Sequence, residues 1–238
     1  MPNTSITKKR LENNWHYNWK IYIFIAVMMV IASEVAFTST EYHPPNENKV
    51  TIMFVDYDIR MDEEQAEALA AELLARVSPQ HENLEAVELI GYPFTYSVDG
   101  YSFDYDKFYI QLTHADNDAF ITSNTFGKKL VEDGFALPLD EYIAAGTFTV
   151  PDGAKVTYLE EPAFDEDGNK IIEGIAKPHL YLISTDPLIR MKDYTRLYHG
   201  GGYSLILLDG CANPEATLDV IEELFAELSA PAQDTAAE

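Results

Sequence analysis

The feature that most constrains this chain is an apolar run close to its N-terminus, from Ile21 to Phe37. Twelve apolar or aromatic residues stand without interruption from Ile21 to Ala32, and Ser33 and Glu34 then break the run. A transmembrane helix needs about 20 apolar residues, whereas the apolar region of a signal peptide has about 7 to 15. The run therefore predicts a retained membrane helix or a cleaved signal, and a buried core helix is the third alternative.

The residues around the run favour the retained helix. Aromatic side chains, which prefer the membrane interface, precede it at Trp15, Tyr17 and Trp19. The positive charge expected on the cytoplasmic side comes from Lys8, Lys9, Arg10 and Lys20. Glu34 occupies the best position for a signal-peptidase site, where a small residue is needed. We predict an uncleaved, single-pass signal-anchor with a cytoplasmic N-terminus and an extracytoplasmic C-terminal domain.

The rest of the chain is strongly acidic. Residues 1–37 contain four Lys/Arg and two Asp/Glu, so the other 12 basic and 38 acidic residues give residues 38–238 a net charge of −26. Binding to nucleic acid or to anionic lipid requires Lys and Arg to neutralise phosphate, so neither is expected of this domain. The acidic surface either keeps the domain soluble or attracts cations or a basic partner.

The exported part is long enough for one domain with a full hydrophobic core. Its single cysteine, Cys211, cannot form an intramolecular disulfide, so the fold depends on that core. We predict the following division of the chain: a cytoplasmic basic segment (1–20), a transmembrane signal-anchor (21–38), a linker (39–49), an extracytoplasmic α/β domain (50–229) and a disordered tail (230–238).

The start of the domain predicts a βαβ unit. Val50 to Val55 is a continuous run of β-branched and apolar residues, typical of a strand covered on both faces. Asp62 can cap a helix with an apolar stripe, and Leu84 to Ile90 alternates like a second strand. Further strands are expected to include Lys155 to Glu160 and Lys170 to Ala176, as arms of one hairpin. The predicted fold is α/β: a single lobe with a mostly parallel or mixed sheet, flanking helices and one preceding transmembrane helix.

Candidate ligand-binding residues stand where strands end. Asp56 and Asp58 follow the first strand, and Ser123 follows a later one; open α/β sheets bind ligands at such carboxyl ends. A segment rich in tyrosine adds Tyr92, Tyr96 and Tyr101. Aromatic side chains at this density either line a sugar- or peptide-binding face or cover the sheet as core residues.

Catalytic motifs are not found. The six histidines show no H-x-x-x-H or H-E-x-x-H spacing, and G-x-S-x-G does not occur. The triple glycine at residues 200–202 leads into a strand instead of a helix N-terminus, so it does not predict a phosphate site. The run Asp116-Asn117-Asp118, with His114, is a weak metal candidate. We predict a protein that is not an enzyme and that has no cofactor and no bound metal.

Three segments resemble the extracellular solute-binding proteins with the type II periplasmic-binding fold. They are VTIMFVDYDIRMDEEQAEALAAELL (Val50 to Leu74), DNDAFITSNTFGKKLVEDGFALPLDEYI (Asp116 to Ile143) and the strand and helix from Tyr203 to Leu228. The resemblance implies an α/β fold, a cell-surface location and a role in transport. Members of this family have two lobes and are usually lipoproteins, whereas this chain has material for one lobe and no lipobox.

Two functions follow as expectations. The first is a membrane-tethered extracytoplasmic binding module that resembles one lobe of a solute-binding protein and takes a small-molecule ligand. The second is an accessory protein that docks on a membrane transporter or a cell-wall partner without a small ligand.

The predicted topology has a direct test. Alkaline phosphatase fused after Thr40 should be active, because its disulfides form only in an oxidising, extracytoplasmic compartment. Phosphatase activity of cells that carry the fusion measures this, and an inactive fusion would contradict an exported domain.

Overall fold

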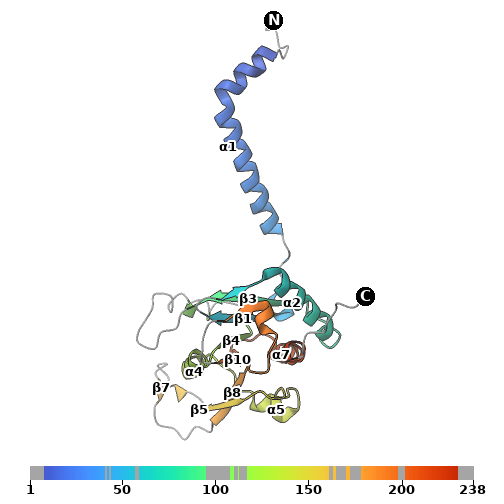
Figure 1. Cartoon of the computed structure of the whole chain (residues 1–238), viewed down its shortest axis with the longest axis vertical. Coiled ribbons are helices and arrows are strands. Elements are labelled where there is room, and N and C mark those ends of the chain that lie inside the picture. The colour runs from blue at the N-terminus through green and yellow to red at the C-terminus, as the bar shows by residue number, and fades with distance from the viewer. Residues whose placement is uncertain are drawn as a thin grey trace. The chain divides into compact units, whose positions relative to one another are not determined.

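The structure is a computed structural model of the whole chain (Figure 1). It describes residues 8–40, 42, 44–56, 59–94, 108–109, 112, 117–160, 163–164, 170–171, 178–197 and 202–229. The chain separates into two compact units, Met1–His43 and Pro44–Glu238.

The first unit contains one long helix, α1 (Lys8–Thr40). Its segment Asn18–Ala36 has 19 residues and a mean hydropathy of 1.8, and is long and apolar enough to cross a membrane. Its apolar side chains are exposed along this segment, which fits a membrane anchor or a signal.

The second unit is built on a six-stranded sheet in the order β3-β1-β4-β10-β8-β5. Its strands are β1 (Lys49–Asp56), β3 (Ala86–Pro93), β4 (Ala119–Ser123), β5 (Val156–Glu160), β8 (Pro178–Ser184) and β10 (Tyr203–Leu207). β1 is parallel to both of its neighbours, and the other pairs are antiparallel. The predicted α/β domain with a mixed sheet is confirmed.

Helices cover both faces of this sheet (Figure 1). Successive side chains of β1 point to opposite faces, so Ile52 and Phe54 belong to one hydrophobic core and Met53 and Val55 to another. The first core contains α2 (Glu63–Val77) and α7 (Pro214–Ser229), and the second contains α4 (Asn124–Glu132). The domain therefore has three layers, with helices on either side of one sheet.

Local sequence explains two of these helices. The side chain of Asp62 accepts a hydrogen bond from the backbone N–H of Gln65 at the start of α2, as its capping pattern predicts. In α4, a Cβ atom at Gly127 would lie 2.8 Å from side-chain carbons of Ile206 and Leu182. Glycine at this position lets α4 approach β10 and β8 closely.

Smaller elements complete the described chain: the 3₁₀ turn η1 (Asn46–Asn48), β2 (Arg60–Met61), α5 (Asp140–Ala145), β6 (Ala163–Phe164), β7 (Lys170–Ile171), α6 (Met191–Tyr194) and β9 (Thr195–Arg196). β2 pairs with β9, and β6 pairs with β7. The expected hairpin therefore has β6 and β7 as its arms. Val156–Glu160 pairs with β8 instead and is the edge strand of the main sheet, so the prediction that it forms an arm of this hairpin is wrong.

Ion pairs hold α2 beside α7. Arg76 of α2 contacts Glu227 at 2.7 Å and Glu223 at 3.4 Å on α7, and it also pairs with Glu72. Glu227 receives a second guanidinium from Arg190, 2.7 Å away. Hydrogen bonds from Arg76 and then from Arg190 lower the pKa of Glu227 below its usual value of 4.5.

We expect Glu227→Gln to destabilise the domain by about 0.5–1 kcal/mol at neutral pH, because ion pairs that solvent still reaches contribute little each. The folded-state pKa of Glu227 is depressed, so its contribution is present above about pH 4.5 and is lost as pH falls through the folded value. Urea unfolding at several pH values measures the difference from wild type, which should shrink toward acid. A difference that is constant with pH would contradict the charged role of Glu227.

Candidate functional site

The carboxyl ends of β1 and β4 lie side by side. Val55 and Thr122 are the last paired residues of these parallel strands, and Asp56 and Ser123 follow them directly. The helices after the two strands, α2 and α4, pack on opposite faces of the sheet. This is a topological switch point, the place where open α/β sheets bind ligands. The structure therefore brings together two of the predicted residues, Asp56 and Ser123.

Asp56 is closely held at this edge. Its side chain is 3% exposed, and its Oδ2 accepts a hydrogen bond of 2.7 Å from the hydroxyl of Tyr203. Its backbone carbonyl accepts a hydrogen bond from the N–H of Phe94. A buried carboxylate needs such donors, because burial without them is costly. Asp56 thus joins β1 to β10, and its role in ligand binding stays a prediction.

Ser123 has a local structural role. Its hydroxyl accepts a hydrogen bond of 3.3 Å from the backbone N–H of Phe126 and so caps α4. Tyr203, the first residue of β10, pairs with Ser123 across the sheet. Sequence reasoning missed Tyr203. Its position directly after the glycine-rich loop, at the start of a buried strand, is the only sequence signal for it.

The described aromatic residues near this edge pack as core. Tyr92 is half-buried, and its ring centroid lies 5.5 Å from that of Phe108. Phe108 also stacks on Phe94 at 4.4 Å and contacts Phe126 at 5.3 Å. These contacts fit the core alternative for Tyr92 and its neighbours. The other predicted residues, Asp58, Tyr96 and Tyr101, lie outside the described residues.

Asp118 marks the opposite end of the sheet. Its carboxylate accepts hydrogen bonds from the backbone N–H groups of Thr51, at 2.7 Å, and Ala212, at 3.2 Å. Burial raises its pKa, although these bonds oppose the shift. Asp118 therefore links β1 and β4 to the loop after β10. His114 and Asp116 lie outside the described residues, and the described part of the chain contains no metal-ligand cluster.

Cys211 lies close to Asp118. Burial, and then the charge of Asp118, raise the pKa of its thiol to about 12. A thiol with this pKa is protonated at neutral pH and is a poor nucleophile, because the thiolate is the reactive form. The arrangement supports a half-buried structural cysteine.

A groove of about 760 Å³ lies elsewhere, between α2 and the edge strand β3. Sequence reasoning did not find it. Its floor and walls come from small and apolar residues of both elements: Ala66, Ala70, Ala71, Leu74, Ala86, Val87, Leu89, Ile90 and Gly91. Ile59 and Met61 close one end, where the absence of a side chain on Gly91 lets them approach β3.

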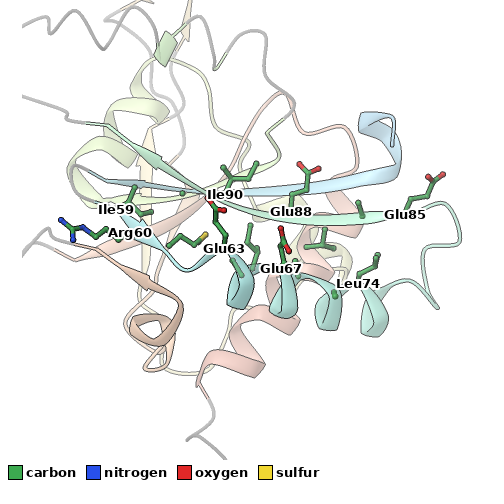
Figure 2. Close-up of a pocket in the computed structure, with 16 residues that line it drawn as sticks. Ile59, Arg60, Glu63, Glu67, Leu74, Glu85, Glu88 and Ile90 are labelled. Carbon is green, nitrogen blue, oxygen red and sulfur yellow. The ribbon is translucent and has the colours of Figure 1, made fainter. Parts of the chain in front are cut away.

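Acidic side chains surround this α2–β3 groove (Figure 2). Glu63 and Glu67 extend from α2 toward β3, while Glu88 and Ile90 extend from the other face of β3. Glu85 stands at one end of the groove and Arg60, its single basic lining residue, at the other. Glu88 contacts Lys49 at 3.6 Å, whereas Glu63 and Glu67 have no recorded ion pair with any described residue.

The outer edge of β3 is regular and open. All eight residues of β3 pair in unbroken register with β1 on the inner side. Among the described residues, no strand pairs with the outer side. β5, at the opposite end of the sheet, has a register shift between Thr157 and Tyr158 that interrupts its pairing. An open, unbulged edge exposes backbone donors and acceptors that another strand can use.

Comparisons with known proteins assign no family to this chain. No protein-family model matches it, and searches of curated proteins and of solved structures also found no match. The resemblance to solute-binding proteins therefore stays a prediction.

We expect Tyr203→Phe to destabilise the domain by about 1–3 kcal/mol, because it removes a hydrogen bond to the buried carboxylate of Asp56. Tyr158→Phe is the matched control, since Tyr158 is 55% exposed and should change stability by less than about 0.5 kcal/mol. Urea unfolding measures both variants. Equal stability of the two would show that Asp56 does not depend on Tyr203.

Proposed function

We propose that the chain is a membrane-tethered, extracytoplasmic binding module that docks on a partner protein through the α2–β3 groove. It acts by binding and carries out no catalysis. The observation that carries the proposal is an open groove lined on one side by β3, an edge strand whose outer side pairs with no strand among the described residues. Such a groove suits a protein segment, which can supply both side chains and a backbone.

The location follows from the order of segments along the chain. The basic residues Lys8, Lys9, Arg10 and Lys20 lie toward the N-terminal end of α1, whose segment Asn18–Ala36 can span a membrane. The acidic domain comes after it, so positive charge lies on the side expected to be cytoplasmic. As a retained anchor, α1 holds the domain at the outer surface, within reach of a transporter or a cell-wall protein.

Two features favour docking over a closed ligand cleft. Among the described residues there are one six-stranded sheet and two two-stranded sheets, and no second lobe that could close over a small molecule. Asp56, the described acid of the predicted ligand site, is buried and already receives the hydroxyl of Tyr203. The α2–β3 groove, by contrast, is bordered by the exposed side chains of Glu63, Glu67 and Ala71.

A small-molecule site at the carboxyl ends of β1 and β4 is the second candidate. The topological switch point formed by these strands and by α2 and α4 favours it. Such a ligand would have to displace or extend the contact between Asp56 and Tyr203.

The docking function is tested by photo-crosslinking in the membranes of cells that make the full chain. Benzoylphenylalanine placed at Ala71 or at Ile90, on the two sides of the β3 edge, should give an adduct with the same partner. Ala68 is exposed on α2 but does not line the groove, so the same probe there should give no such adduct. Immunoblotting and mass spectrometry of the adducts provide the measurement.

A charge-reversal pair adds the matched control. Glu63→Lys with Glu67→Lys should abolish the adduct, whereas Glu132→Lys with Glu141→Lys changes net charge equally on other helices and should leave it. Loss in both, or adducts at Ala68 alone, would overturn docking at the groove. The second candidate would be favoured by two results together. Neither groove position would give an adduct, and a small molecule would stabilise the wild-type domain against heat but not the Asp56→Ala variant.

A further inference from the structure

The geometry points to a particular occupant of the α2–β3 groove: an extended segment of the partner protein, alternating basic and apolar residues, that adds to the sheet as a strand beside β3. This inference rests on the proposed docking function and names the chemistry of the partner. It follows from the open edge, from the two faces that an added strand would meet, and from the charge around them.

The edge of β3 supplies the main-chain part of the recognition. Ala86–Pro93 is eight residues long and pairs regularly with β1, so its outward N–H and C=O groups continue the ladder. A seven-residue strand rises roughly 23 Å, which matches most of the length of β3. Main-chain hydrogen bonds of this kind provide affinity without selecting side chains.

One face of an added strand would meet α2. Its side chains would lie over Ala70, Ala71 and Leu74, with Glu63 and Glu67 beside them. The two glutamates are four residues apart, so they lie on the same flank of the helix. Lysine or arginine suits this face, because its aliphatic stem can cover the alanines while its charged end reaches a carboxylate.

The opposite face of the same strand would meet the other side of β3. Ile90 is there, and its side chain is 40% exposed although it belongs to a sheet. A β-branched or other apolar residue in the neighbouring strand would cover Ile90 through a cross-strand contact. Because side chains alternate along a strand, the two faces together select alternating basic and apolar residues.

Charge argues against a second copy of this chain as the occupant. Pairing two β3 edges would bring Glu85 and Glu88 of each copy together, and residues 38–238 carry −26 overall. Like charges on facing strands destabilise pairing, and charged edges commonly prevent it. Glu63 and Glu67 on the α2 side attract the basic residues of the segment, so the edge is selective for the partner over itself.

The probe is the peptide acetyl-Val-Lys-Val-Lys-Val-Lys-Val-amide, labelled with a fluorophore and titrated with the full chain in detergent micelles at about 150 mM salt. Fluorescence anisotropy should show saturable binding. Glu63→Lys with Glu67→Lys should weaken it about tenfold or more, whereas Glu132→Lys with Glu141→Lys should change it less than about twofold. Equal weakening by both pairs would overturn recognition by the groove acids, because only net charge would then matter.

Backbone methylation separates strand addition from binding by side chains alone. In an added strand, the N–H groups of alternate residues face β3. One set of residues, either the lysines or the inner valines, should therefore have its N–H groups facing β3. N-methylation of that set should abolish binding, whereas N-methylation of the other set should leave the affinity within about threefold. Equal binding of both methylated peptides would overturn strand addition, while the crosslinks at Ala71 and Ile90 would still support docking.

Two further outcomes decide the occupant. Absence of saturable binding would overturn the alternating basic segment. A concentration-dependent dimer of the full chain, seen by sedimentation and lost on charge-conserving changes at β3, would assign the edge to a second copy and overturn the inference. The crosslinking test of the docking function is independent of both.

Discussion

The central position of β1 governs this structure. Both of its edges are paired, with β3 and with β4, and its residues Val50 to Asp56 are buried on both faces. The apolar side chains on the two faces of such a strand are buried only when helices cover both sides of the sheet. α2 and α7 cover one face and α4 the other, so the three layers follow from one apolar segment. The same arrangement leaves β3 at the edge of the sheet, next to α2, and thereby creates the groove.

α2 serves the core and the surface at once. Its apolar stripe, which includes Leu69 and Leu73, is buried against the sheet, while Glu63 and Glu67 border the groove from the adjoining flank. The ion pairs of Arg76 with α7 hold the helix from another side. The proposed docking surface is made from a packed helix and a regular strand, so it is pre-organised and a partner would lose little conformational entropy from this side on binding.

Buried carboxylates link separate segments of the chain by hydrogen bonds at the two ends of the sheet. Asp56 receives the hydroxyl of Tyr203 at one end, and Asp118 receives two backbone N–H groups at the other. Asp56 ends the buried strand β1, and Asp118 directly precedes the buried strand β4. In a sequence, an acidic residue at the end of a buried strand also indicates a ligand site. A structural carboxylate and a ligand-binding carboxylate look alike in sequence, because either one needs hydrogen-bond donors in a low-dielectric interior. Only the three-dimensional structure shows whether the protein itself supplies those donors.

Patterns local in sequence determined an N-terminal helix long and apolar enough to span a membrane, the first strand, the cap of α2 at Asp62 and the mixed α/β class. Each of them depends on neighbouring residues through hydrophobic periodicity or capping. The sequence could not determine that Val156–Glu160 pairs with β8, that Tyr203 meets Asp56, or that β3 and α2 enclose a groove. These features join residues far apart in the chain, and they depend on strand order, because order decides which strand becomes an edge and which side chains meet. Only the tertiary structure sets that order.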